Sequence, residues 1–121
     1  MLDDAKGFDH IYLAAGYTDL RFGIDSLVSM IENEFHLDPY SSSLFLFCGR
    51  RADRIKAVIW EGNGFVLLYK RLETGKYQWP RNESEAMSLT EQQFRWLTEG
   101  LSIEQKRSIP KVFEPAMKPW K

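Results

Sequence analysis

Residues 44–72 read LFLFCGRRADRIKAVIWEGNGFVLLYKRL, and this stretch decides the fold. Leu44–Cys48 is apolar at every position, which is typical of a strand buried on both faces in the middle of a sheet. Two more strands are predicted at Arg54–Glu61 and Phe65–Leu72, because both carry β-branched and aromatic residues. Gly62-Asn63-Gly64 separates them and suits a tight hairpin turn. The stretch therefore predicts three antiparallel strands in a meander.

Upstream of the meander, the sequence predicts one strand and one helix. Ile11–Ala15 is short and apolar and is followed by Gly16, as expected for a strand. Apolar residues then recur at helical spacing between residues 24 and 35, the pattern of an amphipathic helix. Thr18-Asp19 is the predicted start of this helix, with Asp19 as its cap, because an acid is favoured at a helix N-terminus.

Downstream of the meander, a further edge strand is predicted at Lys76–Trp79, where Pro80 would end it. Residues 81–88 read as a polar connector. Thr90-Glu91-Gln92-Gln93 matches a capping box and predicts a helix that ends near Gly100. The same pattern at residues 102–105 predicts a short last helix.

These elements predict an α+β fold: an antiparallel β-meander of about four to five strands packed with two to three helices. We expect the helices to cover one face of the sheet. A chain of 121 residues with 44% apolar and 27% charged residues is expected to form a single domain, residues 1–121, with flexible ends at 1–9 and 110–121.

Basic residues concentrate in one part of the chain. Residues 50–81 hold eight basic and three acidic residues, a net charge of +5, which leaves −6 for the rest of a chain whose total is −1. Aromatic residues interleave with them, a combination used to bind nucleic acid, although a solvated sheet face has the same composition. The predicted nucleic-acid-binding residues are Arg50, Arg51, Arg54, Lys56, Lys70, Arg71 and Lys76. In the hairpin, Lys56 is expected near Lys70 and Arg71.

The sequence argues against several classes of protein. The single cysteine, Cys48, cannot form an internal disulfide, and with only His10 and His36 it gives little material for a metal site. No glycine-rich nucleotide loop or nucleophile motif occurs, so we expect no catalytic residues and no cofactor. The absence of long apolar runs and of a signal peptide predicts no membrane association, and the single cysteine predicts a reducing, cytoplasmic location.

Three carboxylates are candidates for a metal-dependent nuclease site, because such enzymes hold two metals with acidic residues. They are Asp19, Asp25 and Asp53. The less specific interpretation is favoured for each: Asp19 as a helix cap, Asp25 facing solvent, and Asp53 pairing with a neighbouring arginine.

Several motifs together resemble one protein family. They are YLAAGYTDLRFGID at residues 12–25, LDPY at 37–40, LFLFCGRRADRIK at 44–56, WEGNGF at 60–65, YKRLE at 69–73, WP at 79–80 and LTEGL at 97–101. In this order they resemble the small accessory protein of the IS66 insertion sequences, called TnpB or the second-frame protein and unrelated to the RNA-guided nuclease of that name. The resemblance spans about residues 11–103.

The resemblance implies a protein encoded in a bacterial mobile element beside a separate transposase that bears the acidic catalytic residues. It attaches no catalytic residue or cofactor to this chain. The leading hypothesis is therefore a non-catalytic transposition accessory protein that contacts element DNA or the DNA-bound transposase through its basic hairpin face. The alternatives are a transposase adaptor without DNA contact and, third, a metal-dependent nuclease. A homodimer is compatible with the sequence, which leaves the oligomeric state open.

Overall fold

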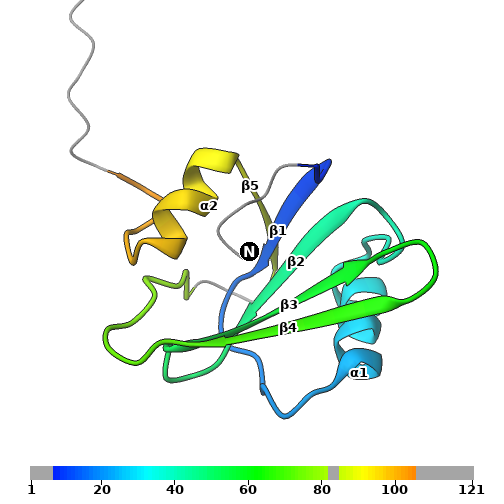
Figure 1. The fold of residues 1–121 in the computed structure, drawn as a ribbon, viewed down its shortest axis with the longest axis horizontal. Coiled ribbons are helices and arrows are strands. Elements are labelled where there is room, and N and C mark those ends of the chain that lie inside the picture. The colour runs from blue at the N-terminus through cyan, green and yellow to red at the C-terminus, as the bar shows by residue number, and fades with distance from the viewer. Residues whose placement is uncertain (1–6, 82–84, 106–121) are drawn as a thin grey trace, which may run out of the picture.

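The computed structural model describes residues 7–81 and 85–105. In chain order, its elements are β1 (His10–Ala14), α1 (Ile24–Ser29), a π-helical continuation η1 (Met30–Glu34), β2 (Ser43–Cys48), β3 (Arg54–Trp60), β4 (Phe65–Arg71), β5 (Ala86–Leu89) and α2 (Glu91–Thr98). The strands form one five-stranded sheet in the order β4-β3-β2-β1-β5 (Figure 1). The predicted α+β class is confirmed.

The sheet is mixed, although most of its strand pairs are antiparallel. Strands β2, β3 and β4 form the predicted meander, and the N–H of Glu61 donates to the carbonyl of Gly64 at 2.9 Å to close its hairpin. Strand β1 instead runs parallel to β2, with Ile11 opposite Leu44. Parallel neighbours need a crossover connection, which α1 and η1 supply here.

Side chains alternate between the two faces of the sheet, and each face has its own core. On the α1 face, Phe45, Phe47 and Val58 pack with Leu27 and Ile31 of the helix. On the α2 face, the neighbouring positions of the same strands pack against α2. The residues of this second cluster include Leu13, Leu44, Leu46, Cys48, Ile55, Ala57, Phe94 and Leu97.

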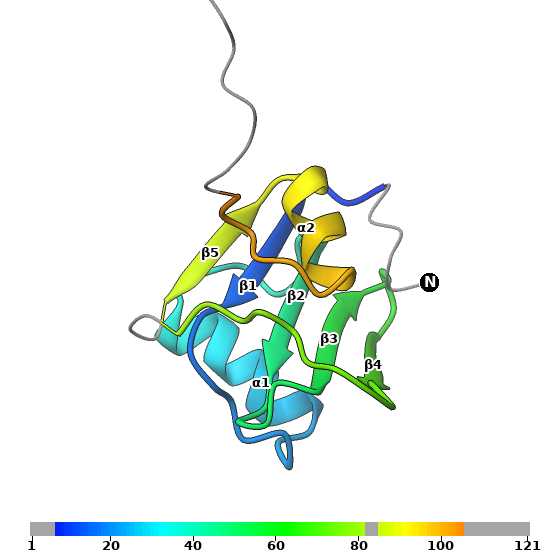
Figure 2. The same cartoon turned by 90° about the vertical axis from the view of Figure 1, so that its left-hand side faces the viewer.

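The two helices lie on opposite faces of the sheet, as Figure 2 shows, with α2 in front of the strands and α1 behind them. The expectation that the helices share one face is therefore wrong. The physical reason is that β2 is apolar at every position from Leu44 to Cys48, so both of its faces need a cover to exclude water. All six residues of β2 are buried.

Helix α1 begins at Ile24, after an N-cap residue, Gly23, that offers no side-chain hydrogen bond. The predicted capping role of Asp19 is wrong, because its carboxylate binds Arg21. The guanidinium Nη2 of Arg21 lies 2.6 Å from Asp19 Oδ2, and the backbone N–H of Arg21 donates to Asp19 Oδ1 at 2.9 Å. The helix also begins five residues after Asp19, whereas a capping side chain lies directly before the first helical residue.

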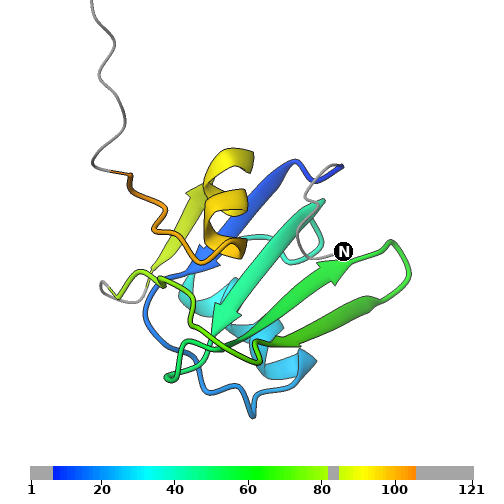
Figure 3. The same ribbon diagram turned by 60° about the vertical axis from the view of Figure 1, so that its left-hand side comes forward.

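Residues 72–80 cross the α2 face and do not form the predicted edge strand, which is a second correction (Figure 3). Tyr77 and Trp79 insert into the α2-face core instead of pairing along an edge. The N–H of Tyr77 donates to the carbonyl of Ala52 at 2.7 Å, and Nε1 of Trp79 donates to the carbonyl of Ala14 at 2.9 Å. These anchors hold the segment over the sheet.

The edge beside β1 is occupied by β5, within the stretch expected to be a polar connector. Met87 pairs with Leu13 and Leu89 with Ile11, and both β5 side chains join the α2-face cluster. The connector prediction is therefore wrong for Ala86–Leu89. Four residues are too few for alternation to stand out from a polar background.

Helix α2 has the predicted capping box. The Thr90 hydroxyl accepts from the N–H of Gln93 at 3.0 Å, and the Gln93 side chain accepts from the N–H of Thr90 at 2.9 Å. At its other end, Gly100 has a φ of +82° and donates to Leu97, while Leu101 donates to Trp96, which is a Schellman motif. Both predicted caps are confirmed.

The predicted last helix is not formed over residues 102–105, and its remainder lies outside the described residues. The expected flexible ends fall almost entirely outside them as well. Within the described ranges, no helix has the length and apolar character that a membrane crossing requires.

Candidate nucleic-acid interface

Basic side chains gather at one end of the sheet. This is the end where β1 and β2 finish, β3 begins and β4 finishes, because Cys48 lies opposite Ile55 and Arg54 lies opposite Arg71. Nine of the ten lysines and arginines in the described residues lie there or in the adjoining loops; Arg95 of α2 is the tenth. We call them the basic end: Arg21, Arg50, Arg51, Arg54, Lys56, Lys70, Arg71, Lys76 and Arg81.

The strand register divides the predicted cluster between two faces. Arg54 lies opposite Arg71 and Lys56 opposite Tyr69, all on the α1 face of the hairpin. Lys70 lies opposite Ile55 and therefore on the α2 face. Of the two cations expected near Lys56, Arg71 lies diagonally across the hairpin from it on the same face, whereas Lys70 lies on the other face; the directly opposed cations are the two arginines.

Acids next to the arginines in sequence offset part of this charge. Arg54 Nε lies 3.3 Å from Asp53 Oδ1, and Arg71 Nη2 lies 3.7 Å from Glu73 Oε2. The Asp53 contact lacks hydrogen-bond geometry, so both of its atoms are buried without a hydrogen-bond partner in the described part of the chain. These pairs reduce the repulsion that two opposed arginines would otherwise cause.

Other cations of the basic end remain available for a partner. Arg50, Arg51, Lys70 and Lys76 are exposed, and no carboxylate of the described residues lies within 4.0 Å of them. We call these four residues the rim cations. They lie in the β2–β3 loop, on β4 and in the segment after β4, so they surround the end of the sheet from several elements.

An open groove of about 620 Å³ lies between the segment before α1 and the α1 face of the β3–β4 hairpin. The lining residues are Asp19, Leu20, Arg21, Arg54, Lys56, Leu67 and Tyr69. Lys56 Nζ donates to the carbonyl of Phe22 at 3.0 Å and so ties that segment to the sheet. The groove combines apolar, aromatic and cationic surface.

Gly49 positions one wall of this groove. A Cβ placed on Gly49 would lie 3.1 Å from Cδ1 of Leu20, which is closer than side-chain carbons normally approach. The missing side chain therefore lets Leu20 pack against the β2–β3 loop. A Cβ at position 49 would require the Leu20 side chain to shift by a few tenths of an ångström.

A second hollow, of about 300 Å³, adjoins the first at Asp19 and Arg21 and is lined also by Tyr17, Thr18 and Arg50. The guanidinium of Arg81 lies 5.9 Å from the centroid of the Tyr17 ring. Sequence reasoning did not include Arg21, Tyr17 or Arg81 in the site. The parallel pairing of β1 with β2 brings the segment of Tyr17 and Arg21 to the basic end. Arg81 reaches the same place from the segment that crosses the α2 face, where the N–H of Gly16 donates to the carbonyl of Pro80 at 2.8 Å.

The residues considered for catalysis are placed differently. Asp19 and Asp53 contact arginines, and Asp25 lies exposed in the first turn of α1. No three histidines, cysteines or acids in the described ranges gather as a metal site would require. Burial raises the pKa of the Cys48 thiol to about 12, and the Asp53 charge adds to the increase, so this thiol is a poor nucleophile.

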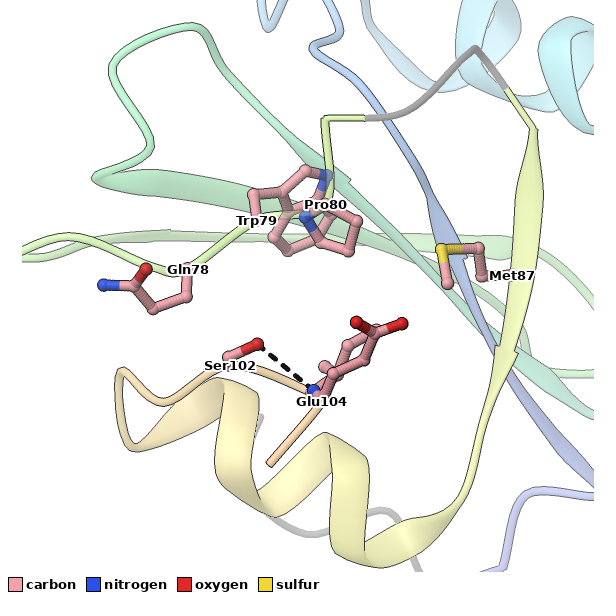
Figure 4. A pocket seen from close by; sticks show the side chains of 7 residues that line it. Gln78, Trp79, Pro80, Met87, Ser102 and Glu104 are labelled. Carbon is pink, nitrogen blue, oxygen red and sulfur yellow. Dashed lines mark hydrogen bonds between the residues drawn. The ribbon is translucent and has the colours of Figure 1, made fainter. Parts of the chain in front are cut away.

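A smaller pocket of about 190 Å³ lies on the α2 face, between residues 78–80, β5 and the chain after α2 (Figure 4). Trp79 and Pro80 face Met87 of β5 and the chain after α2, where the N–H of Glu104 donates to the Ser102 hydroxyl at 3.1 Å. Its lining contains no cation and one carboxylate. It therefore lacks the charge needed to hold a polyanion.

Fold and surface together define a small α+β protein whose most distinctive feature is a cationic sheet end with an adjoining groove. A family model described as "IS66 Orf2 like protein" matches residues 9–108. The chain belongs to this family, whose members are accessory proteins of insertion sequences. The resemblance inferred from its motifs is thereby confirmed.

Two relatives come from Sinorhizobium fredii, and both are named only as uncharacterized proteins. Protein y4jC is 32% identical over 101 residues, which cover 84% of this chain and 86% of y4jC. Protein y4hO is 33% identical over 91 residues, which cover 75% of this chain and 79% of y4hO. No solved structure matches the chain.

Proposed function

We propose that this protein is a non-catalytic accessory factor of transposition that binds the DNA of its insertion sequence through the basic end. The observation that carries the proposal is the placement of nine of the ten described cations at one end of the sheet. Family membership supports the proposal, because the family belongs to insertion sequences, which are DNA elements. The transposase of the same element would supply the catalytic chemistry.

The rim cations are the residues expected to contact phosphates. They are exposed, and lysine and arginine at such positions contact the DNA backbone without reading sequence. Arg54 and Arg71 contribute less net charge, because a carboxylate lies close to each of them, and the Nζ of Lys56 already donates to a backbone carbonyl. Binding through the rim therefore depends strongly on salt.

Affinity for labelled duplex, measured across a salt series, tests the proposal. Each phosphate contact on duplex DNA adds roughly 0.9 to the slope of log K against log salt. Replacing all four rim cations by alanine should flatten the slope by roughly 3 to 4. A comparison of element ends with scrambled duplex shows whether the protein recognises sequence.

A matched pair of single substitutions provides the control. Arg51→Ala removes an exposed arginine of the basic end, whereas Arg95→Ala removes an exposed arginine of α2. Arg51→Ala is expected to weaken DNA binding and Arg95→Ala to leave it unchanged. Equal effects of the two, or no binding by the wild-type protein at low salt, would reject DNA binding by the basic end.

A second function, docking of the transposase, is favoured by an aromatic cluster at the other end of the hairpin. Tyr40 packs edge-on against Trp60 with ring centroids 4.9 Å apart, and Phe65 lies 4.9 Å from Trp60. Tyr40 is 53% exposed, and exposed aromatic residues are frequent anchors of protein interfaces. A pull-down of purified transposase, lost with Tyr40→Ala and kept with Arg51→Ala in the absence of DNA, would support this adaptor function.

A further inference from the structure

The groove of the basic end is lined by apolar and aromatic side chains as well as by charged ones. Leu20 and Leu67 give it apolar surface and Tyr69 an aromatic one, beside Arg21, Arg54 and Lys56. Tyr69 is 53% exposed although it lies within a strand. Duplex DNA presents its phosphates outward and keeps its bases stacked inside, so apolar and aromatic surface in a concave site gains little from it.

We propose that this groove holds an unpaired DNA base stacked on Tyr69, so that the protein prefers single-stranded or overhanging DNA to blunt duplex. The inference rests on the proposed DNA binding by the basic end and names the form of DNA that the site takes. Aromatic side chains inside a positively charged groove are the general means of binding single strands, because every base offers a face for stacking.

The size of the groove agrees with this occupant. Its volume of about 620 Å³ lies within the range of sites for small organic molecules, roughly 300–1,000 Å³. One nucleotide is a small organic molecule of that size class. A base that remains paired within a duplex cannot enter, because its partner strand would have to follow it into the groove.

The groove cations are already held in place by the protein. Arg21 is bound to Asp19, Arg54 lies against Asp53, and Lys56 donates to the carbonyl of Phe22. Lys56 Nζ also lies 6.0 Å from the centroid of the Tyr69 ring. Such fixed polar groups suit the edge of a base better than they suit a mobile phosphate chain. The rim cations, which no described carboxylate neutralises, are then the residues that contact the DNA backbone.

Fluorescence anisotropy with three labelled probes of equal length tests the inference: oligo(dT), blunt duplex and a strand with abasic sites. The wild-type protein should bind oligo(dT) most tightly. Tyr69→Ala should reduce the affinity for oligo(dT) roughly tenfold, the typical loss for one stacked base, and leave the affinity for blunt duplex unchanged. Tyr69→Trp keeps an aromatic face and should retain the wild-type affinity.

Tyr40→Ala is the matched control, because Tyr40 has the same 53% exposure and lies outside the groove. It should leave the affinity for oligo(dT) unchanged. Equal binding of all three probes, or a Tyr69→Ala variant that binds oligo(dT) like the wild-type protein, would overturn the single-strand inference while DNA binding stands. Failure of the wild-type protein to bind any probe at low salt would overturn both proposals.

Discussion

The Asp19 carboxylate accepts hydrogen bonds from both the side chain and the backbone N–H of Arg21. The guanidinium hydrogen bonds, followed by the bond from the backbone N–H, lower the pKa of Asp19 from 3.8 to about 2. A carboxyl whose folded-state pKa lies below its unfolded value stabilises the fold fully above about pH 4. That contribution is lost as the pH falls towards 2.

Asp19→Asn should therefore lower the free energy of unfolding at neutral pH, and the difference from the wild-type protein should vanish near pH 2. The effect is small because the ion pair is exposed. Denaturant unfolding at the two pH values measures it, and an NMR titration of the carboxyl reports the pKa directly. A pKa near 3.8 in the folded protein would show that Arg21 does not hold Asp19 in solution.

The pKa of Cys48 is shifted in the opposite direction to that of Asp19, and the main cause is burial. Desolvation is the main cause that raises the pKa of its thiol to about 12, so almost no thiolate exists at neutral pH. We expect a thiol reagent to modify Cys48 only after unfolding in denaturant. Rapid modification of the native protein would show that the end of β2 opens readily.

Among the secondary-structure elements, α2 depends on its capping box. Thr90→Ala removes the acceptor for the N–H of Gln93 and is expected to cost about 1 kcal/mol of stability. Gln92→Ala is the control, because Gln92 is an exposed residue of the same helix. Urea unfolding should separate the two variants; equal stabilities would mean that the cap contributes nothing in solution.

The strands of the meander were predictable because long apolar runs and a glycine turn specify them locally. The same local rules failed for Lys76–Trp79, whose alternating side chains do become buried. The local sequence does not determine whether such a segment pairs with an edge strand or crosses a face of the sheet, because that depends on which edge of the sheet is free. In this protein β5 takes the edge beside β1, and Trp79 finds its hydrogen-bond partner in Ala14, far away in sequence.

At the scale of the whole molecule, the basic end was predictable from the charge excess of residues 50–81, because a hairpin brings the two ends of its strands together. The groove was not predictable. Its second wall comes from Asp19–Arg21, which reaches the hairpin only because β1 and β2 are parallel. The division between paired and rim cations depends on loop geometry, which composition cannot specify.

Both hydrophobic cores contain side chains of β2, so neither the layer of α1 nor the layer of α2 can unfold alone. Phe45 and Phe47 pack on the α1 face, while Leu44, Leu46 and Cys48 pack on the α2 face. Loss of either layer would expose one apolar face of a strand that is buried throughout. The two layers are therefore expected to unfold in a single cooperative transition.

Phe47→Leu tests this coupling, because it loosens only the α1 face and is expected to cost about 1 kcal/mol. Hydrogen exchange should show equal losses of protection for amides of α1 and of α2, although α2 does not belong to the cluster that contains residue 47. Ser26→Ala, an exposed change on α1, should alter neither helix. If the protection of α2 stayed at the wild-type level in Phe47→Leu, the layers would be independent, and β2 would not transmit destabilisation from one face of the sheet to the other.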